Sequence, residues 1–232
     1  EYEGYFGQLR GLQGAMSTAS PGMFRRSPTS RTLVFNTPSI PLEHQTRSEG
    51  DHRIDSFIAE HIAPLRAEPG QPGYTEIAPY LHVSTYQSWN ELGRFWWSLS
   101  ERQFEPDADL ERTVHTLIDD TTDVRTRVSR IYAWVIDHIR YVGLEYGIHG
   151  HMPYRVSDVV DRGFGDCKDT ASLLYAMFRI AGIDARVVLV RTTRNGEIGE
   201  APASLSAFDH AIAYVPELDL FHPWNIDVAQ AI

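Results

Sequence analysis

One segment constrains the fold of this chain more than any other: residues 161–190, with the sequence DRGFGDCKDTASLLYAMFRIAGIDARVVLV. Its middle part has apolar residues at helical spacing, and Gly182 can adopt the left-handed conformation that ends a helix. The apolar run of residues 185–192 that comes next predicts a strand. Cys167, the only cysteine, comes directly after a glycine-punctuated turn, so we expect it at or next to the first residue of the helix.

Helical periodicity also dominates the region upstream of this segment. Three longer helices and one short helix are predicted there, over residues 88–104, 107–120, 121–142 and 156–163. Ser88 and Thr122 are the expected N-terminal caps of the first and third helices. Downstream, residues 210–215 and about 219–224 predict two antiparallel strands joined by a tight turn. Helices that precede antiparallel strands indicate an α+β fold.

The N-terminal third has a different character. Residues 1 to about 30 lack periodicity and predict a loose lead-in, whereas residues 31–37 predict a strand. Residues 51–65 fit a strand or a helix equally well. Residues 67–85 are rich in proline and glycine and predict a linker that ends in a strand, Tyr80–Ser84. We therefore expect the tail of a β-rich domain plus a linker over residues 1–84, and a second domain over residues 85–232.

Composition excludes several classes of protein. A formal net charge of −10 without any run of basic residues argues against nucleic-acid binding. No apolar stretch of about eighteen residues could span a membrane, and the first residues do not form a signal peptide. The first residue is not methionine, so we expect the chain to be a fragment of a longer protein. A single cysteine excludes a disulfide scaffold.

The position expected for Cys167 suits a nucleophile. The positive end of a helix dipole lowers the pKa of a thiol. Gly163 and Gly165 leave room for a substrate carbonyl beside the sulfur. The backbone N–H groups of the first turn could receive a developing oxyanion. Asp166 and Asp169 oppose ionisation of the thiol, so a histidine partner is needed.

Lys168 offsets those two carboxylates only in part. His210 opens the predicted strand 210–215, and a base on a strand facing a nucleophile on a helix is a known arrangement for activated cysteines. Asp227 lies after the next strand and could orient the imidazole. The three residues Cys167, His210 and Asp227 are therefore the candidate catalytic set.

These residues resemble a known family. The runs RGFGDCKDTASLLYAMFRIAGIDARVVLVRT and FDHAIAYVPELDL are similar to the transglutaminase-like superfamily core, a papain-related fold, in bacterial members that carry a preceding β-rich domain. The resemblance covers about residues 70–221 and implies Cys167 as nucleophile and His210 as base. A Trp followed shortly by an Asp is common in the superfamily, which favours Asp227, with His222 and Asn225 as alternatives.

Plainer interpretations stand beside this one. A lone cysteine is most often a small buried apolar residue. His138, His149 and His151 invite a metal site, but the spacing lacks a second ligand pair, and the glycines favour a loop that borders the substrate cleft. The aromatic cluster of Trp89, Phe95, Trp96 and Trp97 is expected to seal the first helix onto the domain.

The expected function is cysteine-dependent acyl transfer on a peptide or glutamine amide through a thioester intermediate. Hydrolysis by a peptidase or amidase comes first, transamidation second, and a catalytically silent peptide-binding module on the same fold is the alternative from another class. No cofactor and no metal are expected, and the partner is a protein or peptide substrate. Family analogy favours an exported or periplasmic protein, while the oligomeric state is left open.

Overall fold

The structure is a computed structural model that describes residues 6–12, 22–38, 42–59, 62–66, 68–143 and 145–222. The chain forms two compact units. We call the first the β-rich unit, residues 2–92 together with Arg191–Phe208, and the second the helical unit, residues 93–190 together with the residues from Asp209 onward. The segment Arg191–Phe208 therefore belongs with the N-terminal strands, although it lies late in the sequence.

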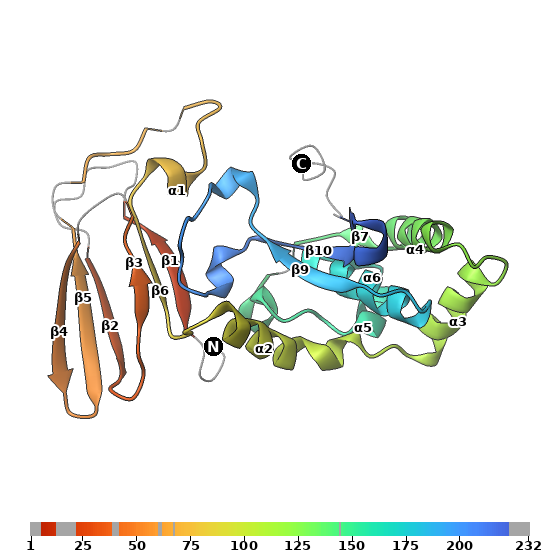
Figure 1. The fold of residues 1–232 in the computed structure, drawn as a ribbon, viewed down its shortest axis with the longest axis horizontal. Coiled ribbons are helices and arrows are strands. Elements are labelled where there is room, and N and C mark those ends of the chain that lie inside the picture. Colours follow the sequence, from red (N-terminus) through yellow and green to blue (C-terminus); the bar gives the residue numbers. More distant parts are fainter. Residues whose placement is uncertain are drawn as a thin grey trace. The chain divides into compact units, whose positions relative to one another are not determined.

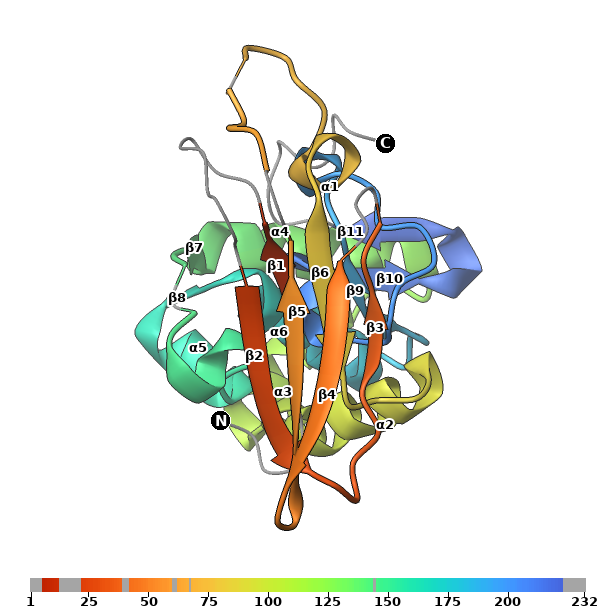
Figure 2. The same ribbon diagram turned by 90° about the vertical axis from the view of Figure 1, so that its left-hand side faces the viewer.

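The β-rich unit contains two antiparallel sheets of three strands each (Figure 1). The first has the order β1–β6–β3, with β1 at Gly7–Gly11, β6 at Tyr80–Ser84 and β3 at Val34–Asn36. The second has the order β2–β5–β4, with β2 at Gly22–Pro28, β5 at His52–Ile58 and β4 at Glu43–Glu49. Figure 2 shows the second sheet face on, with β5 between its two partners.

The outcome for the N-terminal third is mixed. The strand predicted at Tyr80–Ser84 and the one within residues 31–37 are confirmed, and the open choice for residues 51–65 is settled as strand β5. The prediction of a loose lead-in over residues 1–30 is wrong, because β1 and β2 lie there. The predicted linker also contains a short helix, α1, at Tyr74–Ile77.

The helical unit holds most of the helices and an antiparallel sheet. The helices are α2 at Trp89–Ser100, which begins in the β-rich unit, α3 at Ala108–Ile118, α4 at Val124–His138, α5 at Val156–Arg162 and α6 at Cys167–Ile180. The sheet has the order β11–β10–β9, with β9 at Arg186–Val190, β10 at His210–Val215 and β11 at Leu220–His222. A two-residue parallel pair joins β7, Arg140–Tyr141, to β8, Phe164–Gly165. The predicted α+β fold is confirmed.

Several single-turn 3-10 helices complete the description of both units. They lie at Glu101–Phe104, Gly147–Gly150, Thr193–Asn195, Leu205–Ala207 and Pro216–Leu218. The second of these falls within the glycine-rich stretch that precedes α5. The last forms the tight turn that was expected between the two final strands, and it ends at Asp219, which adopts a left-handed conformation with φ 48°.

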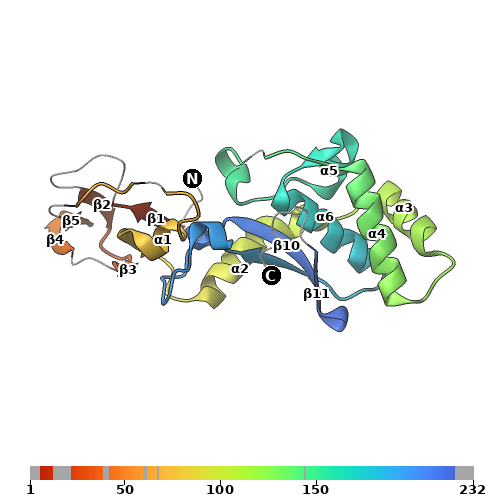
Figure 3. The same ribbon diagram turned by 90° about the horizontal axis from the view of Figure 1, so that it is seen from above.

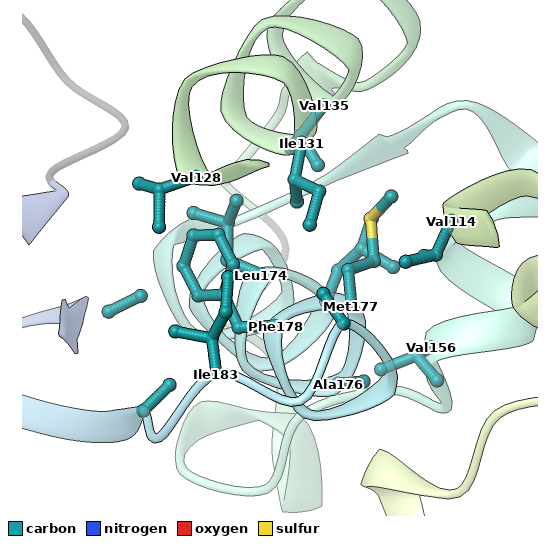
Figure 4. Close-up of a cluster of buried hydrophobic side chains, with 14 of the residues drawn as sticks. Val114, Val128, Ile131, Val135, Val156, Leu174, Ala176, Met177, Phe178 and Ile183 are labelled. Atoms are coloured by element: carbon teal, nitrogen blue, oxygen red, sulfur yellow. The ribbon is translucent and has the colours of Figure 1, made fainter. Parts of the chain in front are cut away.

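Helix α6 lies at the centre of the helical unit. Its side chains Leu174, Met177 and Phe178 are almost completely buried. Figure 4 shows residues of α4 pointing at them from above and Val114 of α3 approaching from one side. Figure 3 shows α6 between strand β10 and helices α3 and α4. One helix therefore contacts every layer of the unit, so its position is strongly determined by packing.

Two details of the helices correct the sequence interpretation. The N-terminal cap of α4 is Asp123 and not Thr122, because the Asp123 carboxylate accepts the Thr126 N–H at 2.8 Å. The aromatic cluster on α2 is only partly a core, since Trp96 is buried whereas Trp89 and Trp97 remain 46% and 43% exposed. The cap at Ser88 is confirmed by its hydroxyl, which accepts the Glu91 N–H.

Candidate active site

Cys167 is the first residue of α6. Asp166 caps the helix and accepts the Asp169 N–H, while the Asp169 carboxylate accepts the Asp166 N–H in return. This reciprocal capping box holds the first turn in a defined geometry. The helix has fourteen residues, so the positive end of its dipole lies at the thiol, as the sequence predicts.

Gly165 permits the close approach of this turn to α6. A Cβ atom at this position would lie 2.8 Å from the Asp169 Cβ and 3.3 Å from a Val159 methyl group. Gly163 ends α5 with a φ of 67°, a left-handed conformation that suits glycine. The two glycines therefore allow the turn that presents Cys167, while the room they were expected to leave for a substrate carbonyl stays a prediction.

The acidic neighbours of the thiol are paired. Asp166 forms an ion pair with Lys168, and both side chains are buried. The Asp169 carboxylate is completely buried and accepts hydrogen bonds from the Arg162 guanidinium at 2.8 Å and from the Tyr154 N–H at 2.9 Å. Arg162 also lies over the Tyr154 ring, 4.1 Å from its centroid. The two carboxylates thus have partners of their own and form part of the scaffold.

The side chain of Cys167 is 6% exposed and packs against Ala171 and Ala211. Burial, and secondarily the negative charge of Asp166, raises the pKa of the thiol to about 11, although the Ala211 N–H lowers it. The thiol is therefore protonated at neutral pH in this structure. The helix dipole alone does not ionise it, which agrees with the expectation that the thiol needs a histidine partner.

His210 is the first residue of β10 and pairs with Val190 of β9. It directly precedes Ala211, the residue that packs on the thiol. Its Nε2 atom is buried and, among the described residues, has no hydrogen-bond partner. Burial lowers the pKa of His210, while Asp209 and Asp166 raise it. The described residues include no hydrogen bond between His210 and the sulfur, so its role as base stays a prediction.

The third member of the predicted set falls beyond the described residues. Asp227, with Trp224 and the alternative Asn225, lies outside them. The other alternative, His222, is the last described residue and pairs through its backbone with Ala213 of β10. The identity of the orienting residue therefore remains a prediction.

Tyr141 is a neighbour of the thiol that the sequence interpretation missed. Strand β7 aligns Tyr141 with Gly165, two residues before Cys167. The Cys167 N–H points at the Tyr141 hydroxyl, and burial with the nearby Cys167 and Glu145 raises the pKa of Tyr141 to about 12. No local pattern could have identified it, because Tyr141 reaches the site through a parallel pairing across 24 residues (165 − 141).

Two of the histidines considered as metal ligands each stack on a different aromatic ring. His138 stacks on Trp134, and His149 stacks on Tyr154 with ring centroids 3.5 Å apart. Within the described part of the chain, no group of three His, Cys, Asp or Glu side chains is arranged to hold a metal ion. In that same part, none of the helices has the length and apolar character that crossing a membrane requires.

Solved structures of other proteins were compared with this fold. A crystal structure of a candidate protease from Parabacteroides distasonis matches with a TM-score of 0.83 and 18% identity, over 97% of this chain and 44% of that one. This chain therefore spans less than half the length of that protein. Two other structures match less well, a candidate cysteine protease from Cytophaga hutchinsonii (TM-score 0.40, 13% identity, 94% and 78% covered) and the periplasmic domain of TgpA from Pseudomonas aeruginosa (TM-score 0.35, 17% identity, 92% and 71% covered).

A search of the curated proteins found no match. The family model described as the transglutaminase-like superfamily matches residues 111–224, a range that includes both Cys167 and His210. The family and the fold together support a cysteine-dependent enzyme in general terms. Residues 111–224 of this chain belong to the transglutaminase-like superfamily.

Proposed function

We propose that the helical unit catalyses cysteine-dependent acyl transfer on a peptide amide, with hydrolysis as the usual outcome. The observation that carries this proposal is the position of Cys167 at the first turn of α6, beside a strand whose opening histidine has a buried nitrogen with no hydrogen-bond partner among the described residues. A buried polar atom without a partner costs free energy, and an imidazole nitrogen that is not already hydrogen-bonded is free to accept a proton from a nearby thiol.

The first chemical step can be derived from the protonation states. Because burial keeps the Cys167 thiol neutral and His210 uncharged, the two act as acid and base and not as a preformed ion pair. His210 accepts the thiol proton at Nε2 while the sulfur attacks the carbonyl carbon, and the C=O electron pair moves to the oxygen. His210 then returns the proton to the leaving amine, and a thioester remains on Cys167.

The developing oxyanion has two donors within reach. The Cys167 N–H, which points at the Tyr141 hydroxyl in this structure, would instead donate a hydrogen bond to the substrate oxygen. The Tyr141 hydroxyl would then donate a hydrogen bond to the same oxygen. Its pKa is raised to about 12, so it stays protonated and remains a donor throughout the working pH range. In the second half-reaction His210 accepts a proton from the water that attacks the thioester carbon, the carbon–sulfur bond breaks, the carboxylic acid leaves, and His210 returns the proton to the Cys167 sulfur.

Asp227 is the residue we propose to orient the His210 ring, and an amine that replaces water would convert the same site into a transamidase. A silent binding module is the second candidate, and one observation favours it. The Cys167 side chain is only 6% exposed and its pKa is raised, which is also how an inert structural cysteine behaves. Export from the cytoplasm remains a proposal by family analogy.

An activated acyl donor separates these two candidates. Incubation with p-nitrophenyl acetate should give a burst of p-nitrophenol equal to the enzyme concentration, with the acetyl group on Cys167 by mass spectrometry. Addition of glycine ethyl ester would move acetyl to the amine if transamidation competes with hydrolysis.

Two variants provide the controls. Cys167→Ser should abolish the burst and leave thermal stability almost unchanged, since the exchange is nearly isosteric. His210→Ala should slow acylation by about a hundredfold or more, which is the usual contribution of a general base. Wild-type protein that folds normally but gives no burst and no adduct would establish the binding module instead.

A further inference from the structure

Residues 145–153 form a loop that is tied to the first turn of α6 at both of its ends. Just before it, the Val142 N–H donates to the Gly165 carbonyl at 2.9 Å. Just after it, the Tyr154 N–H donates to the buried Asp169 carboxylate at 2.9 Å. Gly165 and Asp169 lie two residues on either side of Cys167, so the loop is anchored on both sides of the thiol.

The loop is also ordered internally. The His149 N–H donates to the Tyr146 carbonyl at 3.1 Å, and the indole N–H of Trp96 on α2 donates to the His151 carbonyl at 3.0 Å. The His149 ring stacks on Tyr154. A loop held by backbone and ring contacts presents its remaining side chains in a fixed arrangement, which is what recognition of a ligand requires.

Two large apolar side chains and one carboxylate of this loop are exposed to solvent. Tyr146 is 80% exposed, the largest exposed fraction of any large apolar side chain in the described residues, and Ile148 is 49% exposed. Both belong to the same short 3-10 turn or its first flanking residue. Exposed apolar side chains are typical of a contact surface for a ligand, and the loop that carries these two is hydrogen-bonded at its flanks to Gly165 and Asp169 on either side of Cys167.

Glu145 gives this surface its charge. Its carboxylate is exposed, forms no ion pair within the described part of the chain, and lies close enough to act electrostatically on both Cys167 and Tyr141. Asp166, by contrast, is neutralised by Lys168. An unpaired negative charge here opposes both a thiolate and an oxyanion. A carboxylate that disfavours thiolate formation in the free protein can favour reaction with a substrate whose positive charge neutralises it.

We infer that Glu145, Tyr146 and Ile148 recognise a peptide substrate that carries a lysine or arginine side chain next to an apolar residue, close to the amide that is attacked. This inference rests on the proposed function. The substrate's cation pairs with Glu145, and the apolar neighbour lies on Tyr146 and Ile148. Pairing removes the negative charge that opposes thiol ionisation, so binding of a cationic substrate and activation of Cys167 are coupled, each favouring the other.

Charged thiol reagents test this without knowledge of the natural substrate. We would measure the rates at which Cys167 reacts with a cationic methanethiosulfonate (ethyltrimethylammonium) and with an anionic one (ethylsulfonate), following adduct formation by mass spectrometry. The cationic reagent should react faster with the wild type. Glu145→Gln should lower the cationic-to-anionic rate ratio by roughly fivefold, and higher ionic strength should lower it in the wild type.

The matched control is Glu111→Gln, which removes an exposed carboxylate from α3 of the same unit and should leave the ratio unchanged. Tyr146→Ser tests the apolar part and should lower the rate of a benzyl reagent relative to a methyl reagent. Equal ratios in wild type and Glu145→Gln would overturn the inference while leaving the proposed function intact. Failure of every reagent to modify Cys167 in the folded protein would overturn both.

Discussion

The first turn of α6 and the middle of strand β6 both bury polar side chains, but they treat them differently. At α6, the buried Asp169 carboxylate has three hydrogen-bond donors, from Arg162, Tyr154 and Asp166. At β6, His82 is completely buried, yet neither ring nitrogen has a partner among the described residues. Burial, with the nearby positive charge of Arg191, lowers the pKa of His82 to about 4.

The difference shows that burial by itself does not indicate a functional site. A satisfied carboxylate stabilises one geometry of the surrounding backbone, whereas an unsatisfied histidine is a cost that the β-rich unit carries. His210 resembles His82 in having an unpaired buried nitrogen, but it lies at the end of β10 that packs on the thiol. The location of the unpaired atom, more than its existence, is therefore the reason to propose a function for His210 and none for His82.

The largest effect should come from breaking the α6 network. Asp169→Ala removes the acceptor of three donors and leaves the Arg162 guanidinium without its buried partner. We expect it to lower the free energy of unfolding by about 3–5 kcal/mol, as for other buried ion pairs that lose one partner. Urea unfolding monitored by tryptophan fluorescence would measure this.

The matched control for that variant is Asp120→Ala, which removes the partner of Arg130 from an exposed ion pair. It should change the unfolding midpoint within experimental error, because exposed pairs contribute little. Equal effects of the two variants would mean that the capping network is no more than a surface feature.

The second effect tests the weak point in β6. The folded-state pKa of His82 lies below its unfolded value of 6.5, so the unfolded chain binds the proton more tightly. The stability associated with neutral His82 is fully present above about pH 6.5 and is lost as the pH falls towards 4, at most about 3 kcal/mol. Urea unfolding between pH 4 and 7 should show this loss in the wild type.

His82→Leu supplies the control for this titration. It should flatten the pH dependence over the same interval and raise the stability at neutral pH, because it removes two unpaired polar atoms from the interior. A wild-type and a variant curve of the same shape would show that His82 finds a partner in solution, and the contrast with Asp169 would then disappear.

The smallest expected effect concerns an exposed polar contact, the N-terminal cap of α4. Asp123→Ala removes the N-terminal cap of α4, whose carboxylate accepts both the N–H and the hydroxyl of Thr126. We expect the Tm to fall by a few degrees at most. Thr122→Ala, at the position that the sequence favours, should leave the Tm unchanged. A larger effect of Thr122→Ala would show that Thr122 is the cap in solution.

The helical unit could be predicted well, and the reason is physical. Helices α3, α4 and α6 carry a periodic apolar stripe because each lies on the same core, and periodicity survives in the sequence. Strand β4, Glu43–Glu49, has seven exposed residues, and its pairing with β5 combines backbone hydrogen bonds with polar contacts of His44 and Thr46 to Asp55, so it has no alternating apolar pattern. Backbone pairing leaves no trace in side-chain composition, so strands of this kind escape a prediction based on residue type.

The candidate site likewise has features that could be predicted from the sequence and features that could not. The position of Cys167 could be predicted because a glycine turn before a helix is a local pattern. The state of its acidic neighbours could not be deduced, since the partners of Asp169 come from α5 and the segment before it. Arg162 has no feature in the sequence that distinguishes it from any other arginine. Tyr141 lies beyond local inference because it reaches the site through long-range pairing of β7 with β8.

The length of helix α4 determines where Tyr141 lies relative to Cys167. Its buried face docks on α6, and its chain continues within two residues of its end into β7, which carries Tyr141 beside Cys167. A one-residue insertion within its last turn would rotate the residues after the insertion by about 100° and advance them by about 1.5 Å. The packing of α4 on α6 would be kept, but Tyr141 would no longer lie beside the Cys167 thiol. We therefore expect homologues to differ in length at the turn of residues 119–123 and not within α4. A deletion in the last turn of α4 should abolish activity without unfolding the protein.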